Sequence, residues 1–397
     1  MESPERFAAL PDYAFPRLRA LLEGVDPGDS EPVEMTIGDP RHAPPAFVAK
    51  VVAEHAAAFR SYPPNDGAPA LLEACARWLG RRYDRRADPA TEIMALNGTR
   101  EGLFNACLAL CPERKNGARP FVLTPNPFYQ VYAAAALAVG AEPRFVNAGA
   151  DTGHLPDFAA LDAATLNRTA VVYVCSPANP QGAVASLDWW SALLRLAERH
   201  DFLVFADECY AEIYRGAPPV GVLEAVRATG ADPERVVAFH SLSKRSSLAG
   251  LRSGFAVSGP KTIAAMKRLR AYAGAPLPLP LQMAAAAAWD DEVHVEANRA
   301  LYAAKFQDAA EAFADVPEVA IPEAGFFLWL PVPGAEGGEA AALRLWRDAG
   351  VKVLPGAYLA RDTPAGNPGH DYVRAALVAD PANTARGLRR LRRTLYR

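Results

Sequence analysis

The sequence predicts an α/β fold with one large, mostly parallel sheet and a smaller α+β unit. Short apolar runs such as "TAVVYVC" and "RVVAFHS" alternate with helical patterns such as "LDWWSALLRLAERH". Strands that are apolar throughout are buried on both faces, which is typical of parallel strands covered by helices. Polar residues follow directly after several of these runs, so the strand ends are expected to carry function.

The large unit is expected over residues 45–289. Its predicted strands are "EIMALNG", "PFVLTPNP", "TAVVYVCSPANP", "DFLVFADECY", "RVVAFHSLS" and "SGFAVSG". Helical patterns separate several of them, beginning with the stretch from Arg100 to Leu110. Helices between parallel strands cover both faces of the sheet.

Residues 290–397 are expected to form the smaller unit. A long helical pattern, "DEVHVEANRALYAAKFQDAAEAFA", precedes strand-like "GFFLWLPV", "VKVLPG" and "DYVRAALV", and a final helix begins at Pro381. The N-terminal segment, residues 1–44, contains the helix-like "FPRLRALLEGV" and is expected to pack against this unit.

Charge and cysteine content narrow the functional class. The 42 basic and 45 acidic side chains give a net charge of −3, which favours neither nucleic acid nor an anionic membrane as partner. Five cysteines without a CxxC pair indicate reduced thiols and no metal site. No signal-peptide pattern or membrane-spanning segment is visible, so a cytoplasmic protein is expected.

The stretch "HSLSKRSSLAGLRSG" brings Lys244, Arg245 and Arg252 close together among serines and glycines. Neighbouring cations repel one another unless an anion lies among them. Serine hydroxyls and close backbone approach at glycine suit a phosphate beside a reactive amine. A solvated basic loop is the alternative interpretation of this stretch.

Polar residues at three strand ends are expected to meet. In open parallel sheets, ligands bind outside the carboxyl ends of the strands. Asn179 in "SPANP", Asp207 and Tyr210 in "DECY", and Lys244 in "HSLSK" therefore become candidates for one site. An imine-forming lysine near an aspartate that holds a pyridinium nitrogen is the arrangement used with pyridoxal phosphate.

The motifs "SPANPQG", "ADECY", "SLSKRSSLAGLRSG" and "YVRAAL" resemble those of the aspartate aminotransferase superfamily, in order and in approximate spacing. The resemblance extends over nearly the whole chain. It implies the fold type I architecture of class I and II aminotransferases, with pyridoxal 5'-phosphate as cofactor. One departure is Gln181, at a position where the family often has threonine.

The resemblance implies roles for four residues around the cofactor ring. Lys244 would form the Schiff base and then move the proton at the substrate Cα. Asp207 would hold the pyridine nitrogen protonated, and Tyr210 and Asn179 would donate to the ring 3-oxygen. Asp207 as a helix or turn cap and Asn179 as an Asn-Pro turn are the structural alternatives.

The resemblance also implies a phosphate site in two halves. Ser241, Ser243 and Arg252 match the hydroxyl and arginine positions of the family, and "NGTREGLF" supplies Thr99 with the backbone amide of Arg100. A helix N-terminus binds phosphate through its free N–H groups and its dipole. Ordinary N-capping by Thr99 is the alternative.

The remaining implied contacts involve the substrate and a second subunit. Tyr129, or its neighbour Phe128, would stack on the cofactor, and Tyr62 would reach the phosphate of the partner in a homodimer with shared sites. Arg374 would clamp the substrate α-carboxylate, beside a backbone contact from Gly38. A structural ion pair is the alternative role for Arg374.

Finer motifs, including "IGDPRH", "YPPNDGAPAL" and "DECYAEIY", resemble the bacterial N-succinyldiaminopimelate aminotransferases of lysine biosynthesis. That branch implies glutamate and 2-oxoglutarate as one pair, and N-succinyl-2-amino-6-oxopimelate as acceptor. Candidates for binding the extra anions are Arg41, His42, Arg100 and Arg245. The alternatives are aspartate, aromatic or acetylornithine aminotransferases, a cysteine-conjugate β-lyase, and a cofactor-binding regulatory protein without turnover.

Overall fold

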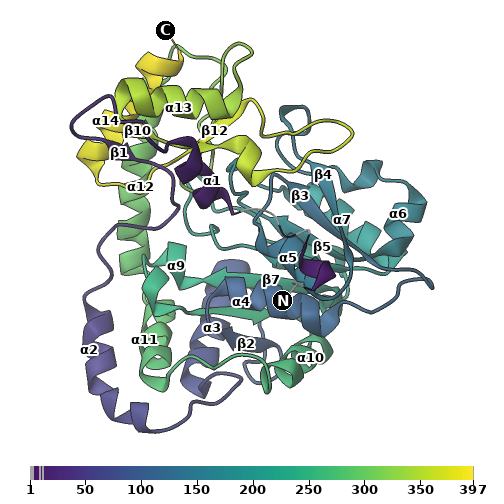
Figure 1. Ribbon diagram of the computed structural model, residues 1–397. Coiled ribbons are helices and arrows are strands. Elements are labelled where there is room, and N and C mark those ends of the chain that lie inside the picture. Colours follow the sequence, from purple (N-terminus) through teal and green to yellow (C-terminus); the bar gives the residue numbers. More distant parts are fainter. Residues whose placement is uncertain (1–3, 9, 11–12, 397) are drawn as a thin grey trace.

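A computed structural model describes residues 4–8, 10 and 13–396 (Figure 1). Its strands are β1 (Val33–Glu34), β2 (Ile93–Leu96), β3 (Phe121–Asn126), β4 (Glu142–Asn147), β5 (Thr169–Cys175), β6 (Leu203–Asp207), β7 (Val236–Ser241), β8 (Gly254–Val257), β9 (Phe327–Pro331), β10 (Val351–Lys352), β11 (Leu354–Pro355) and β12 (Tyr372–Ala376).

Helices alternate with these strands along most of the chain. They are α1 (Ala14–Leu21), α2 (Phe47–Glu54), α3 (Pro69–Tyr83), α4 (Thr99–Leu110), α5 (Val131–Ala138), α6 (Ala163–Arg168), α7 (Leu187–His200), α8 (Val222–Thr229), α9 (Leu242–Arg245), α10 (Pro260–Arg270), α11 (Leu279–Asp290), α12 (Val293–Ala312), α13 (Gly337–Ala349) and α14 (Pro381–Leu395).

The large sheet has seven strands in the order β2-β8-β7-β6-β5-β3-β4. β8 runs antiparallel to both of its neighbours, and the other described pairings in this sheet are parallel. Consequently β2, β3, β5, β6 and β7 all end at the same edge. This arrangement, with the smaller sheets beside it, confirms the predicted α/β fold class.

Each face of the large sheet has its own hydrophobic core. Val172, Val174 and Val204 pack with residues of α3, α7, α8 and α11. Val171, Tyr173 and their neighbours on the opposite face pack with α4, α5 and α10. Because successive strand residues point to opposite faces, the continuous apolar runs supply both cores at once.

The C-terminal part contains a three-stranded antiparallel sheet in the order β11-β12-β9. Helices α12, α13 and α14 pack with it in one core, which also takes in Val33 and Met35 of the N-terminal segment. β1 pairs in parallel with β10, so that segment is bound to the C-terminal part. The boundaries at residues 44 and 289 stay predictions.

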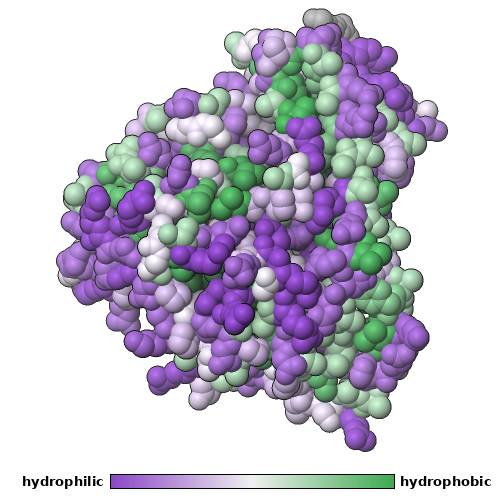
Figure 2. All heavy atoms as spheres, turned by 180° about the vertical axis from the view of Figure 1, so that it is seen from behind, coloured by the Kyte–Doolittle hydropathy of each residue, from purple (hydrophilic) through white to green (hydrophobic). Residues whose placement is uncertain are grey.

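Helix α12 runs between the large sheet and the C-terminal part, as Figure 1 shows. Within the described residues, no helix has the length and apolar content needed to cross a bilayer. From behind, hydrophilic side chains cover much of the surface, and apolar side chains lie among them in separate groups (Figure 2).

Candidate active site

A cavity of about 460 Å³ opens at the edge where the parallel strands end. All the residues predicted to contact the cofactor or the substrate α-carboxylate line it, except Tyr62. They are Gly38, Thr99, Arg100, Tyr129, Asn179, Asp207, Tyr210, Ser241, Ser243, Lys244, Arg252 and Arg374. The structure therefore brings these residues together, and their individual roles stay predictions.

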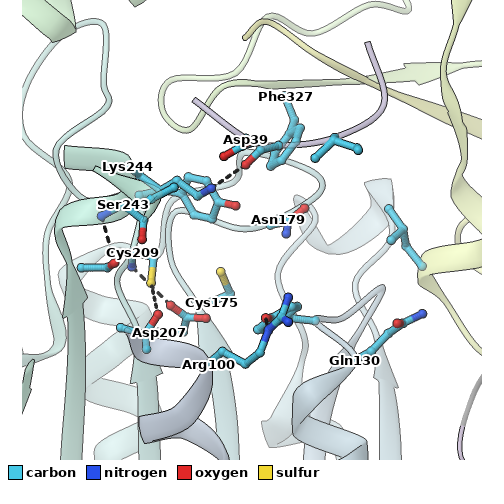
Figure 3. Close-up of a pocket in the computed structure, with 18 of the residues that line it drawn as sticks. Asp39, Arg100, Gln130, Cys175, Asn179, Asp207, Cys209, Ser243, Lys244 and Phe327 are labelled. Carbon is cyan, nitrogen blue, oxygen red and sulfur yellow. Dashed lines mark hydrogen bonds between the residues drawn. The ribbon is translucent and has the colours of Figure 1, made fainter. Parts of the chain in front are cut away.

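Lys244 projects into this cavity from the short helix α9 (Figure 3). The Ser241 hydroxyl caps that helix by accepting a 3.1 Å hydrogen bond from the Ser243 N–H. Lys244 Nζ donates to the carbonyl oxygen of Gly38. Burial lowers the pKa of the Lys244 ammonium to about 8, so a neutral amine is available at milder pH than for an exposed lysine.

Asp207 ends β6 and is buried. Its carboxylate accepts from the Tyr132 hydroxyl at 2.7 Å and from the Cys209 N–H at 3.3 Å. Both donors are neutral, and burial raises the pKa of the carboxyl above its usual range. A cationic N–H at this position would offset the cost of burying the charge.

Arg374, on β12, is also buried. It donates to Asn179 Oδ1 at 2.9 Å and to the Thr36 carbonyl at 2.7 Å, and its guanidinium lies 4.2 Å from the Phe327 ring centroid. Its Nε is buried without a hydrogen-bond partner among the described residues. Burial lowers the pKa of Arg374 to about 10.

These contacts argue against the ion-pair alternative for Arg374, since both of its described acceptors are neutral. A buried guanidinium with an unused N–H presents a site for an anion. Asn179 would serve two groups. Its Oδ1 accepts the hydrogen bond from Arg374, so the donation predicted toward the cofactor would come from its side-chain NH2 group.

The predicted phosphate site is accessible to solvent at Arg252. Arg252 is exposed and has a left-handed backbone, with φ of 57°, and it donates to the carbonyls of Ala249 and Asn97. Gly98, which precedes α4, has φ of 80°, and a Cβ at that position would collide with the Arg252 guanidinium. A glycine is therefore required where the N-terminus of α4 and Arg252 meet.

Part of the cavity lining is exposed or half-buried. Arg100 is exposed and Tyr129 is half-buried, and we call these two residues the mouth. Arg100 Nε donates to the Tyr129 hydroxyl at 2.6 Å. The exposed Asp39 lies elsewhere in the lining, near Lys244 and Phe327 (Figure 3). The cavity can therefore present a guanidinium and a carboxylate to a bound molecule at two separate places.

Two of the cations expected to bind extra anions have other partners. Arg245 is buried against Trp289, and it pairs with Glu292 at 2.9 Å and donates to the Ala288 carbonyl. His42 contacts Asn298 and Lys305. Arg41 is exposed and is not among the cavity-lining residues, so Arg100 is the member of the expected set that faces the cavity.

Several lining residues were not expected from the sequence. Asp39, Cys175, Cys209 and Phe327 line the cavity, and Tyr132 supports Asp207 from behind. The sequence does signal Cys175 and Cys209, because both lie at strand ends beside predicted residues. Tyr132 shows only an aromatic position in a helical pattern, which is more often part of the core.

The cavity fits the expected cofactor. A buried carboxylate whose two described hydrogen-bond donors are neutral suits a pyridinium N–H, and a half-buried lysine with a lowered pKa suits the aldehyde. Ser241, Ser243, Thr99 and Arg252 supply donors for a phosphate. The unpartnered Arg374 Nε suits the carboxylate of an amino acid beside that cofactor.

Comparisons with known proteins agree with this geometry. The profile of the family described as aminotransferase class I and II matches residues 30–391. An LL-diaminopimelate aminotransferase of Dehalococcoides mccartyi is 30% identical over 397 residues, which cover 98% of each chain. An aminotransferase structure from Neisseria meningitidis is 39% identical, covers 99% of this chain and 100% of its own, and has a TM-score of 0.94.

A third similar protein, from Thermus thermophilus, is described as a probable N-succinyldiaminopimelate aminotransferase. It is 26% identical, has a TM-score of 0.83, and the match covers 96% of this chain and 100% of its own. The family match covers most of the chain and includes the whole cavity except its N-terminal fringe. The chain therefore belongs to the class I and II aminotransferases, which use pyridoxal phosphate to transfer amino groups.

Proposed function

We propose that this aminotransferase exchanges an amino group between glutamate/2-oxoglutarate and an acceptor of the diaminopimelate class, as a step of lysine biosynthesis. The preferred acceptor is N-succinyl-2-amino-6-oxopimelate. The observation that carries this proposal is the presence of two guanidinium groups at different depths of one cavity. Arg374 is buried in its wall, and Arg100 is exposed at its mouth.

The deep guanidinium suits the feature that both substrates share. Glutamate and the acceptor each carry an α-carboxylate, and Arg374 offers an unpartnered Nε toward it. Bidentate arginine–carboxylate contacts fix orientation as well as charge. Arg374 would thereby hold the Cα–H near Lys244, which lines the same cavity.

The exposed guanidinium suits the feature in which the substrates differ. Glutamate ends in a nearby carboxylate, whereas the acceptor is longer and carries its remaining anions far from Cα. Arg100, held by Tyr129, is an exposed guanidinium in the cavity lining and would suit such a distal anion. A pocket for an apolar or aromatic side chain would not need this second cation.

The reaction assigns a proton task to two titratable groups of the cavity, Lys244 and Asp207. When bound, the cofactor supplies an electron-withdrawing ring that stabilises negative charge at the substrate Cα. Lys244 Nζ takes the Cα proton and returns it. Asp207, supported by Tyr132, holds the proton on the ring nitrogen, and Tyr210 and Asn179 donate toward the ring 3-oxygen.

LL-diaminopimelate itself is the second candidate. The relative from Dehalococcoides mccartyi carries that substrate in its name, and the cavity lining contains a carboxylate, Asp39. Free diaminopimelate has a distal ammonium as well as a distal carboxylate, and Asp39 would suit that ammonium. The succinylated compound lacks that ammonium and gains a carboxylate.

Specificity constants would separate these candidates. We expect N-succinyl-LL-diaminopimelate with 2-oxoglutarate to exceed LL-diaminopimelate, aspartate, acetylornithine and phenylalanine in kcat/KM. A higher value for LL-diaminopimelate, reduced by Asp39→Asn, would establish the second candidate. A clear preference for one of the other three would refute the diaminopimelate class, and pyruvate release from a cysteine conjugate without amino transfer would indicate a β-lyase.

We also propose a homodimer with shared active sites. Tyr62 is fully exposed in the single chain and is not among the cavity-lining residues, which suits a side chain that completes the site of a partner. Mixing inactive Lys244→Ala chains with inactive Tyr62→Ala chains should restore part of the activity in hybrids. A fully active monomer in sedimentation would contradict this proposal.

A further inference from the structure

A chain of polar contacts outside the cavity joins the N-terminal segment to helix α12. His42 Nδ1 lies 2.8 Å from Asn298 Oδ1, and His42 Nε2 lies 2.7 Å from Lys305 Nζ. Asn298 and Lys305 both belong to α12 and are both buried. None of these three residues lines the cavity, and the proposed chemistry does not use them.

The surrounding contacts decide which nitrogen of His42 carries its proton. Asn298 Nδ2 donates to the carbonyls of Lys244 and Arg245 at 3.2 and 3.1 Å, so Asn298 Oδ1 must face the histidine as an acceptor. His42 Nδ1 is therefore the donor. Nε2 is then left with a lone pair, which accepts from Lys305, whose ammonium also donates to the Leu377 carbonyl at 3.1 Å.

The segment that carries His42 also covers the cavity. The carbonyl of Gly38 accepts from Lys244 Nζ, and the carbonyl of Thr36 accepts from Arg374 at 2.7 Å. The carbonyl of Met35 accepts from Ala376 N at 2.7 Å. Gly38, Thr36 and Met35 thus contact Lys244, Arg374 and the strand β12 that carries Arg374. His42 follows four residues after Gly38.

The same contact chain reaches Lys244 from its other side. Asn298 holds the main-chain carbonyl of Lys244, while Gly38 holds its amine. Displacement of His42 would remove a hydrogen bond from Asn298, and it would release the C-terminal end of the segment that carries Gly38. One side chain is therefore placed to influence both ends of the same lysine.

We propose that His42 is a positioning residue: its neutral ring latches residues 37–42, the C-terminal end of the segment, onto α12, and so holds the Gly38 carbonyl and the Lys244 turn in place for amino transfer. The inference rests on the assignment of Lys244 to the chemistry. The exchange measurement below does not depend on that assignment, so it separates failure of the latch from failure of the proposed function.

Protonation of His42 would open the latch, because its Nε2 could no longer accept from Lys305 and two cations would face each other. The charged and titratable groups around the ring are Lys305 and Tyr302 of α12 and Asp39 of its own segment, with Asp380 acting on Lys305. Burial lowers the pKa of His42, and Lys305 lowers it further. The latched state therefore binds the proton less tightly than the released state, and it is lost as pH falls below the ordinary histidine range.

Hydrogen–deuterium exchange of the holoenzyme tests the latch directly. His42→Ala should speed exchange of residues 33–46 about tenfold, because two part-buried hydrogen bonds are lost. KM for both amino donors should rise by a similar factor and kcat should change less, since saturating substrate can still close the segment. The exposed His55→Ala is the matched control and should leave exchange, KM and kcat unchanged.

His42→Gln separates the latch from its protonation. Its amide oxygen can reach the acceptor position of Nε2 and it does not titrate. We expect it to recover much of the wild-type KM and to remove the extra exchange that wild-type residues 33–46 show as pH falls from about 7.5 to 5.5, after correction for the intrinsic rate.

Three results would overturn the proposal. Exchange of residues 33–46 in His42→Ala could equal that of wild type. Exchange could instead rise across the whole chain together with a large fall in Tm, which would mean a general loss of stability. Identical acid-side exchange in wild type and His42→Gln would show that another group carries the pH dependence.

Discussion

Arg374 in the wall of the cavity and Arg100 at its mouth are both guanidinium groups, but their surroundings differ. Arg374 is buried, is held by Asn179 and the Thr36 carbonyl, and rests on Phe327. Arg100 is exposed and has a hydrogen bond to Tyr129.

Arg374 and Asp207, which we call the wall groups, lie on strands β12 and β6 of two different sheets, whereas Arg100 lies in the first turn of α4. A group fixed in this way suits a contact that every substrate makes. A group with an exposed, adjustable side chain suits a contact that distinguishes substrates. Substitutions in the wall should therefore damage all reactions, and substitutions at the mouth should damage some of them.

Lys244→Ala should have the largest effect, a loss of at least roughly 10⁴-fold in amino transfer, because one amine serves as nucleophile and as proton carrier. In the wild type, borohydride should fix the cofactor on the peptide that contains Lys244. Since the pKa of Lys244 is lowered to about 8, the rate of cofactor capture by apo-protein should rise roughly tenfold per pH unit and level off near pH 8. Label on another lysine would refute the assignment.

Asp207→Ala should lower kcat about 10²–10³-fold, since removing one partner of a buried charge pair costs roughly 2–5 kcal/mol. Thermal unfolding of the apo-protein should change little, because burial raises the pKa of the Asp207 carboxyl and its charge therefore costs the folded apo-protein stability. Asp207→Asn, which keeps the volume, should be similarly impaired. Turnover within a few-fold of wild type would exclude Asp207 as the partner of the ring nitrogen.

Arg374→Lys should lower kcat/KM about 10²-fold for glutamate and for the diaminopimelate-class substrate alike. A lysine keeps the charge and loses the bidentate geometry. Each half-reaction can be followed separately by the change of the cofactor spectrum. Impairment of one half-reaction alone would show that Arg374 does not bind the shared α-carboxylate.

Arg100→Met should lower kcat/KM about 10- to 30-fold for the longer substrate and less than threefold for aspartate. A partly exposed charged hydrogen bond contributes roughly 1.5–2 kcal/mol. The matched control is Arg41→Met, which removes an exposed arginine that does not line the cavity. Equal losses for both substrates would place Arg100 with the wall groups.

Tyr132→Phe should have the smallest effect, about a threefold to tenfold fall in kcat, because it removes one neutral hydrogen bond to Asp207. Loss of this donor raises the pKa of Asp207 further, since the tyrosine hydroxyl stabilises the ionised carboxylate. The pH profile of kcat should therefore shift upward on its acid side. An unchanged profile would mean that Tyr132 only fills space.

Residues at strand ends were predictable, because parallel strands bring their carboxyl ends to one edge. That rule placed Asn179, Asp207 and Lys244 in one cavity without knowledge of any contact. The direction of a side chain on a helix was not predictable from charge alone. Arg245 follows Lys244 on α9, and a step of about 100° turns it away from the cavity into the core.

Two other features lacked a usable signal. β4, "EPRFVN", is an edge strand with a proline and two charged residues, so its pattern is weak. Asp39 lies in a segment without regular structure, whose course over the cavity depends on β1 pairing with β10 at the other end of the chain. Local patterns carry no information on such distant pairing.

The contact between Thr36 and Arg374 joins positions 338 residues apart. A ribosome adds about 5–20 residues per second, so the first part of the cavity exists for many seconds before the last part is made. Lys244 and Asp207 can be in place on the large sheet while β12 is still absent. During synthesis, the chain is therefore expected to form the pocket around Lys244 first and to add the carboxylate-binding Arg374 last. A ribosome-bound chain truncated before β12 should therefore capture the cofactor aldehyde although it cannot yet select an amino acid.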